Sequence, residues 1–272
     1  MAGPAVDAQL TATLDLTARL VAAGLLVWGI ETWSRRASFA HGGWFSLAAV
    51  EPPDGTRALR AVDRTLRPLL AVEVAGAAGV LAVGVWTVPG RVALVALAAG
   101  YGAARWRRRL GGDGGEQMSA LVLLALLLAV LPAPSTTRAW AAVVLVAAQA
   151  ALAYLTAGVA KVASPAWRTG TALPGILATY THGDARTAGL LTRIPLLGLA
   201  GGWAVVLYEC TFVVLVLGPR DVALAVLAVG LVFHLACAVL MGLSGFVWAF
   251  TATYPCVLLA GDAVRSVISV GQ

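Results

Sequence analysis

The stretch AWAAVVLVAAQAALAYLTAGVAK, residues 139–161, decides the fold of this chain. It contains no charged side chain from Ala139 to Ala160, and a helix needs about 20 apolar residues in succession to cross the hydrocarbon core of a bilayer. The run ends at Lys161. The stretch therefore predicts a transmembrane helix that carries a primary amine at its C-terminal end.

The position of Lys161 has two interpretations. A charged amine at the edge of the hydrocarbon region is costly, so burial there favours the neutral form. A neutral amine can accept a proton, which makes Lys161 a candidate catalytic base. Alternatively, the ammonium group extends along its own helix to reach the lipid headgroups, as lysines near helix ends often do. The residues themselves leave both interpretations open.

The composition indicates an integral membrane protein. Hydrophobic residues make up 60% of the 272 residues and charged residues only 12%, about half the charged share of a typical soluble domain. The net charge of +6 is explained by Lys and Arg in cytoplasmic loops, so it does not indicate a nucleic-acid partner. The partner that the composition predicts is the lipid bilayer.

The fold class that we predict is an all-α bundle of about eight transmembrane helices. The apolar segments lie at 14–30, 69–86, 90–104, 118–132, 139–161, 195–217, 221–242 and 245–261. Pro89-Gly90 and Gly218-Pro219 predict tight turns, and hence antiparallel hairpins.

The loops are too short for a soluble domain. Those at Glu31–Pro68 and Val162–Pro195 are longer, and their mixture of Trp and Arg is typical of the membrane interface. We therefore predict one membrane domain over residues 1–272, with its core at about 14–261.

The basic residues predict the orientation. Arg is concentrated in the loops after the first, third, fifth and seventh predicted spans, most densely at Arg105-Trp106-Arg107-Arg108-Arg109. Loops rich in Lys and Arg usually stay in the cytoplasm. We therefore expect a multi-pass protein of the cytoplasmic (inner) membrane, with Lys161 on the cytoplasmic side.

Glu209 and His234 lie inside predicted spans, where a polar residue needs a partner or a role. Glu209 must be protonated or paired, and Lys161 or an arginine is its natural partner. That pairing would be either functional or purely structural. His234 is either a hydrogen-bonded core histidine or part of a site. The three cysteines show no metal-ligand spacing, so we predict no metal site.

The spacing of residues before Lys161 places several on one helix face. Tyr154, Gly158 and Lys161 stand at positions i, i+4 and i+7. Gly158 leaves space beside that face for a neighbouring helix or a flat ligand. Trp167 and Gly170 follow in the next loop, where they are candidates for a lid.

These residues resemble a known family. The pattern Tyr154-x-x-Ala-Gly158-Val-x-Lys161, followed by Trp167-x-x-Gly170, is similar to the signature of the vitamin K-dependent γ-carboxylase-like family, whose membrane part is called the HTTM domain. The pair Phe233-His234 and the later Tyr254-Pro255 resemble a second motif of that family. Arg19 and Glu31 resemble its first span more weakly, and the order of spans agrees over residues 14–261.

The resemblance implies a membrane enzyme that uses a reduced naphthoquinone of the vitamin K or menaquinone type, with O2 and CO2 as co-substrates. In the family, the lysine that matches Lys161 deprotonates the hydroquinone. The anion takes up O2 to give a strong base, which removes a γ-proton from a glutamyl side chain before CO2 adds. By resemblance, we expect catalytic roles for Lys161, His234 and Glu209. The quinone-binding residues that we expect are Tyr154, Gly158, Trp167, Gly170, Tyr208 and Phe233.

The chain departs from the family in three respects. It offers no soluble region that would grip a propeptide, and its fourth predicted span begins with Glu116-Gln117-Met118-Ser119, without a histidine. The arginine distribution also places Lys161 on the cytoplasmic face, whereas the animal enzyme works on the lumenal face. The substrate is therefore open between a peptide and a small molecule.

The alternative function is a non-catalytic HTTM module that serves as a partner or immunity subunit of a peptide-maturation system. The Ala-, Val- and Arg-rich composition favours a GC-rich bacterial source.

Overall fold

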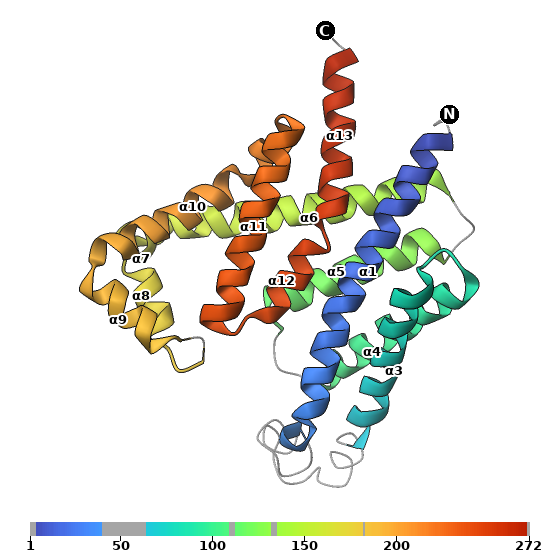
Figure 1. Ribbon diagram of the computed structural model, residues 1–272, viewed down its shortest axis with the longest axis horizontal. Helices are drawn as coiled ribbons and strands as arrows, with labels where there is room; N and C mark the ends of the chain where they lie inside the picture. The colour runs from blue at the N-terminus through green and yellow to red at the C-terminus, as the bar shows by residue number, and fades with distance from the viewer. Residues whose placement is uncertain (1–3, 40–63, 109–111, 132–134, 182, 271–272) are drawn as a thin grey trace. The chain divides into compact units, whose positions relative to one another are not determined.

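A computed structural model describes residues 4–39, 64–108, 112–131, 135–181 and 183–270 of the chain (Figure 1). These ranges contain helices and no strand, which confirms the all-α prediction. The elements are α1 (Pro4–Ser34), η1 (Arg36–Phe39), α3 (Leu66–Val83), α4 (Val88–Arg108), α5 (Gly114–Val130), α6 (Thr136–Ala163), α7 (Pro165–Arg168), α8 (Ala172–Leu177), α9 (Ala185–Arg193), α10 (Pro195–Leu217), α11 (Arg220–Met241), α12 (Ser244–Thr251) and α13 (Tyr254–Val270).

Six helical segments of the described ranges are long and apolar enough to cross a membrane. They are Ala8–Ser34, Leu66–Val83, Thr136–Ala163, Pro195–Leu217, Arg220–Met241 and Ser244–Ser269. The chain therefore has the helices of a multi-pass membrane protein. The predicted spans at 90–104 and 118–132 correspond to α4 and α5, which are not among the six; α5 is apolar but has only 17 residues. The count of eight spans stays a prediction.

The chain forms two compact units, Met1–Ala142 (unit 1) and Val143–Gln272 (unit 2), with the boundary inside α6. Unit 1 contains α1 and the α3–α5 region. Unit 2 contains most of α6 and all later helices, including every residue that we predicted for the site. Most of the predicted interfacial loop at Glu31–Pro68, and Arg109 of the arginine cluster, lie outside the described residues.

In unit 1, a carboxylate from α1 closes the turn between α3 and α4. The turn begins at Gly84, whose φ of 68° is a left-handed conformation that favours glycine. The N–H of Val85 donates to Oδ1 of Asp15 at 2.9 Å, and Nε of Arg19 donates to Oδ2 of the same carboxylate at 2.7 Å. Arg19 also donates to the carbonyl of Leu81, near the end of α3.

The turn that we predicted at Pro89-Gly90 is wrong. The helix α3 ends at Val83, and α4 already begins at Val88, so Pro89 and Gly90 lie in the first turn of α4. Proline fits there because the first N–H groups of a helix have no intrahelical acceptor. The connection at Gly218-Pro219 lies where we predicted it, between the end of α10 at Leu217 and the start of α11 at Arg220.

The last predicted span, 245–261, consists of two helices. The first, α12, ends at Thr251, and α13 begins at Tyr254, with Pro255 as its second residue. Proline has no N–H to donate to α12, so the hydrogen-bond ladder is interrupted at this point. The second helix then continues to Val270, well beyond the predicted end.

The predicted loop at Val162–Pro195 contains three short helices, α7, α8 and α9. Pro165 opens α7, and Asp184 caps α9 by accepting hydrogen bonds from the N–H groups of Arg186 and Thr187. Gly170, between α7 and α8, has a φ of 80°. This segment leads directly from the C-terminal end of α6 to the start of α10.

Candidate functional site in unit 2

The central feature of unit 2 is an ion pair between Lys161 on α6 and Glu209 on α10. The Nζ atom donates to both carboxylate oxygens, at 2.9 Å to Oε1 and 2.7 Å to Oε2. The side chain of Glu209 is 5% exposed and that of Lys161 21%. Of the partners that we predicted for Glu209, Lys161 or an arginine, the structure contains Lys161, and its ammonium group forms an ion pair instead of extending toward headgroups.

The direction of α6 explains why Lys161 points inward. The Cα–Cβ bonds of a helix tilt toward its N-terminus, so a side chain near the C-terminal end leans back over the preceding turn. The preceding turn carries Gly158, which lies against α10 at Glu209 and Cys210. The ammonium group therefore reaches the Glu209 carboxylate without extending away from the helix bundle.

The space beside Gly158 is occupied by the neighbouring helix. A Cβ atom at this position would lie 2.7 Å from Sγ and 2.9 Å from the backbone N of Cys210. A real Cβ atom almost never makes contacts this short, so glycine is what allows α6 and α10 to approach so closely. Of the two occupants that we considered for this space, the structure contains the helix.

Trp167 and Gly170 cover the same end of the site. The Trp167 ring on α7 lies 5.2 Å from the Nζ atom of Lys161, within the range of a cation–π interaction. The turn that follows packs tightly on α10, because a Cβ atom at Gly170 would lie 2.6 Å from Cα of Leu199. The structure thus places Trp167 directly beside the amine.

The second feature of unit 2 is a hydrogen bond between Tyr154 on α6 and His234 on α11. The hydroxyl oxygen and Nε2 lie 2.8 Å apart, and both residues are 2% exposed. Their rings belong to an aromatic cluster: Phe212 stacks on Tyr154 with centroids 4.0 Å apart, and Phe250 stacks on His234 at 4.4 Å. The other imidazole nitrogen, Nδ1, has no hydrogen-bond partner among the described residues.

Three tyrosine hydroxyls converge on Gly230 of α11. A Cβ atom there would clash with the hydroxyl of Tyr208, and would lie 2.6 Å from that of Tyr254 and 3.4 Å from that of Tyr154. Gly230 precedes His234 by one helical turn, so both face the same cluster. The missing side chain of Gly230 makes room for the phenol groups.

The ion pair and the aromatic cluster lie along one seam between α6, α10 and α11. On α6, Tyr154 and Lys161 share a face two turns apart, about 10 Å along the helix axis. On α10, Tyr208 and Glu209 are consecutive. Tyr154 and Tyr208 belong to the aromatic cluster, whereas Lys161 and Glu209 form the ion pair. His234 contacts Tyr154 directly; no described contact joins it to the Lys161–Glu209 pair.

Several residues of this seam were missed by the sequence analysis. Phe212 and Phe250 resemble ordinary core residues, and Gly230 resembles one of many packing glycines. Their spacing could have predicted them: Phe212 follows Tyr208 by four residues, and Gly230 precedes His234 by four, so each shares a helix face with a predicted site residue. Phe233, which we predicted as a ring-binding residue, lies beside Tyr208 with ring centroids 5.9 Å apart.

Unit 1 also contains polar residues inside its helices. Glu73 on α3 is fully buried, and α4 packs closely on it at Gly100. Glu116, near the start of α5, pairs with Arg105 at 3.1 Å, and its N–H donates to the capping residue Asp113. These residues belong to unit 1, whereas every residue of the candidate site belongs to unit 2.

Comparison of this chain with family models, curated proteins and solved structures finds no match.

Proposed function

We propose that unit 2 is an acid–base site that takes a proton from a reduced naphthoquinone, as in vitamin K-dependent carboxylase-like HTTM enzymes. The observation that carries the proposal is the buried contact of Lys161 with both carboxylate oxygens of Glu209, at 2.7 and 2.9 Å. Ionisable groups inside membrane spans are expensive and usually functional. The resemblance in sequence around Tyr154, Gly158 and Lys161 supplies the class of reaction.

The charge of the pair suits proton abstraction in a medium of low dielectric constant. Lys161 and Glu209 together carry no net charge at rest. When the pair accepts one proton from a ring hydroxyl, it gains one positive charge, while the ring retains one negative charge. The total stays zero, so the ammonium group of Lys161 compensates the new anion without help from water. A lone amine or a lone carboxylate would lack this balance.

The surroundings of the pair suit a flat aromatic ligand. Next to it along the seam are the rings of Tyr154, Tyr208 and Phe212, which pack on one another and make this part of the interior aromatic. The free Nδ1 atom of His234 provides a polar atom that a ring oxygen would satisfy. When bound, a reduced naphthoquinone would supply two electrons to O2. The residues themselves would hold the ring, accept its proton and exclude water.

The finer parts of the proposal come from the resemblance and from the distribution of arginines. They comprise the use of O2 and CO2, a peptide or small-molecule substrate that loses a proton, and a location in the inner membrane with the site toward the cytoplasm. Burial favours this chemistry because a strong base must be kept from bulk water.

The test is quinol-dependent oxygen consumption by the full chain in liposomes, with menadiol as the probe and quinone products separated by chromatography. Lys161→Met removes the ammonium group that compensates the new anion, and loss of one such stabilising donor typically slows a reaction by a factor of about 100 to 1,000, so we expect about a 100-fold loss. Thr156→Val is the matched control, since this exposed residue of α6 bonds only to its own helix. Undiminished turnover in a folded Lys161→Met protein would refute the proposal.

A second function is favoured by one observation. The Lys161 ammonium group already contacts both Glu209 oxygens and the Trp167 ring, which are the contacts expected if the pair only fastens α6 to α10. In that case the chain is a non-catalytic HTTM module that acts through a partner protein. The wild-type chain would then oxidise no menadiol, and Lys161→Met would change its stability alone.

A further inference from the structure

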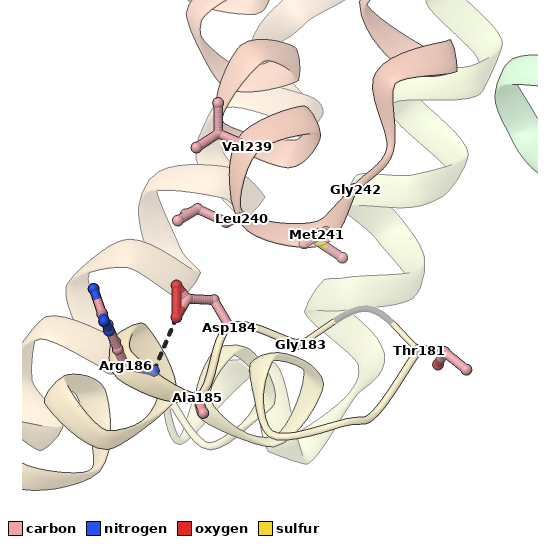
Figure 2. A pocket seen from close by; sticks show the side chains of 9 residues that line it. All are labelled: Thr181, Gly183, Asp184, Ala185, Arg186, Val239, Leu240, Met241 and Gly242. Carbon is pink, nitrogen blue, oxygen red and sulfur yellow. Dashed lines mark hydrogen bonds between the residues drawn. The ribbon is translucent and has the colours of Figure 1, made fainter. Parts of the chain in front are cut away.

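Unit 2 contains an open cavity of about 640 Å³ between the N-terminal end of α9 and the C-terminal end of α11 (Figure 2). Asp184 and Arg186 line one side, and Val239, Leu240 and Met241 line the other. This volume lies within the range of about 300–1,000 Å³ that small-molecule sites occupy. The cavity is separate from the Lys161–Glu209 pair, and the proposed function does not use it.

The polar side of the cavity carries two opposite charges. The carboxylate of Asp184 is fixed by the N–H groups of Arg186 at 2.8 Å and Thr187 at 3.3 Å. These hydrogen bonds lower the pKa of Asp184, so its negative charge is present at neutral pH. The charge of Arg186 also favours the ionised form of Asp184. In the part of the chain that the structure describes, the guanidinium of Arg186 makes no ion pair and no side-chain hydrogen bond. It is therefore available to an anionic group of a ligand.

The dipoles of the two helices reinforce this arrangement. The N-terminus of a helix carries a partial positive charge and the C-terminus a partial negative one. The start of α9 thus adds to the charge of Arg186 and stabilises the carboxylate of Asp184 that caps it, while the end of α11 on the other side of the cavity carries a partial negative charge. A ligand with one negative and one positive group would match the two charges on the polar side of the cavity.

The apolar side of the cavity continues into an exposed stripe on α11. Val232, Leu235 and Val239 are 66%, 45% and 80% exposed, and their spacing places them on one helix face. Because α11 is one of the apolar helices long enough to cross a membrane, such a face is suited to hydrocarbon chains. The ligand should therefore combine a zwitterionic group with an acyl chain.

We propose that this cavity binds the headgroup of phosphatidylethanolamine, with its phosphate at Arg186, its ammonium group at Asp184 and an acyl chain along Val232, Leu235 and Val239. Asp184 disfavours lipids whose only charge is negative. It also discriminates against phosphatidylcholine, because a quaternary nitrogen has no N–H to donate to a carboxylate. A primary ammonium group carries a positive charge for Asp184 and also has N–H groups that can donate to its carboxylate.

The experiment is native mass spectrometry of the full chain, released from detergent after titration with dioleoyl lipids that carry ethanolamine, choline or glycerol headgroups. We expect the ethanolamine lipid to bind about tenfold more tightly than the other two, as one charge-assisted hydrogen bond allows. Equal binding of ethanolamine and choline lipids, or tighter binding of the anionic glycerol lipid, would overturn the proposal.

Two variants test whether Asp184 binds the ammonium group of the lipid and whether Arg186 binds its phosphate. Asp184→Ser keeps a residue that caps α9 but removes the charge, so the preference for ethanolamine over choline should disappear while the helix remains. Arg186→Gln should weaken both zwitterionic lipids about tenfold. The control is Arg193→Gln, which removes the same charge from the last turn of α9, outside the cavity lining. An equal effect of Arg193→Gln would mean that only the net charge of the surface matters, and would refute the site.

Discussion

Tyr154 on α6 and His234 on α11 share a hydrogen bond of 2.8 Å in the interior of unit 2. Tyr154 also stacks on Phe212 and meets Tyr208 edge to face, so its ring and its hydroxyl have separate partners. The contribution of the hydrogen bond can therefore be measured apart from that of the ring.

Tyr154→Phe should keep the stacked ring and leave Nε2 of His234 without its partner. A buried polar atom that loses its hydrogen bond costs about 1–3 kcal/mol, so we expect the free energy of unfolding to fall by that amount. The measurement is equilibrium unfolding in detergent. Tyr208→Phe is the comparison: its hydroxyl makes a long 3.4 Å bond to the carbonyl of Val226, so its loss should cost less. Equal losses of unfolding free energy in the two variants would show that the Tyr154–His234 hydrogen bond stabilises the protein no more than the Tyr208 bond does.

Gly230→Ala should disturb the cluster of tyrosine hydroxyls, because the new methyl group would clash with the Tyr208 hydroxyl. Overpacking of this kind costs about 1–3 kcal/mol, measurable as a lower free energy of unfolding. The control is Gly175→Ala on α8, where a Cβ atom meets nothing within 4 Å. Adding Tyr208→Phe should restore part of the stability lost in Gly230→Ala; no restoration would contradict the contact.

The Lys161–Glu209 pair should show strong coupling in a double-mutant cycle of Lys161→Met and Glu209→Leu. Each single change leaves one buried charge without its partner, which costs about 3–5 kcal/mol. The double variant leaves none, so it should be more stable than the sum of the two changes predicts. The cycle needs unfolding free energies of four proteins. Additive effects would mean that the two side chains do not interact in solution.

The start of α9 should loosen in acid. The hydrogen bonds from Thr187 and Arg186 lower the pKa of Asp184, so the cap is fully present above the ordinary aspartate pKa of about 3.9 and is lost as the pH falls through the lower, folded value. The measurement is the ¹⁵N chemical shift of Thr187 from pH 6 to pH 2. In Asp184→Ser, whose hydroxyl does not titrate in this range, the transition should be absent. A transition that persists in this variant would assign the effect to another group.

The long apolar stretches allowed the fold class to be predicted from the sequence, because hydrocarbon requires helices whatever the packing. The partnership of Lys161 and Glu209 was predictable for the same reason: a buried charge needs its opposite. Spacing on α6 also placed Tyr154, Gly158 and Lys161 on one face, as the structure shows.

Features that depend on contacts between distant segments were not predictable. The turn after α3 begins at Gly84 and not at Pro89, because Asp15 and Arg19 from another helix satisfy its backbone groups. The sequence did not predict whether a helix or a ligand lies beside Gly158, because a glycine makes room for either one. The convergence of three tyrosine hydroxyls on Gly230 could not be predicted either, because the residues involved come from four helices.

The carboxylate that closes the α3–α4 turn belongs to a helix made earlier in the chain. The N–H of Val85 and the carbonyl of Leu81 find their partners only when α1 has already delivered Asp15 and Arg19. During synthesis from the N-terminus, α1 is made before the hairpin whose backbone groups it satisfies. A circularly permuted chain that makes α3 and α4 before α1 would have to assemble this hairpin with its backbone groups still hydrated.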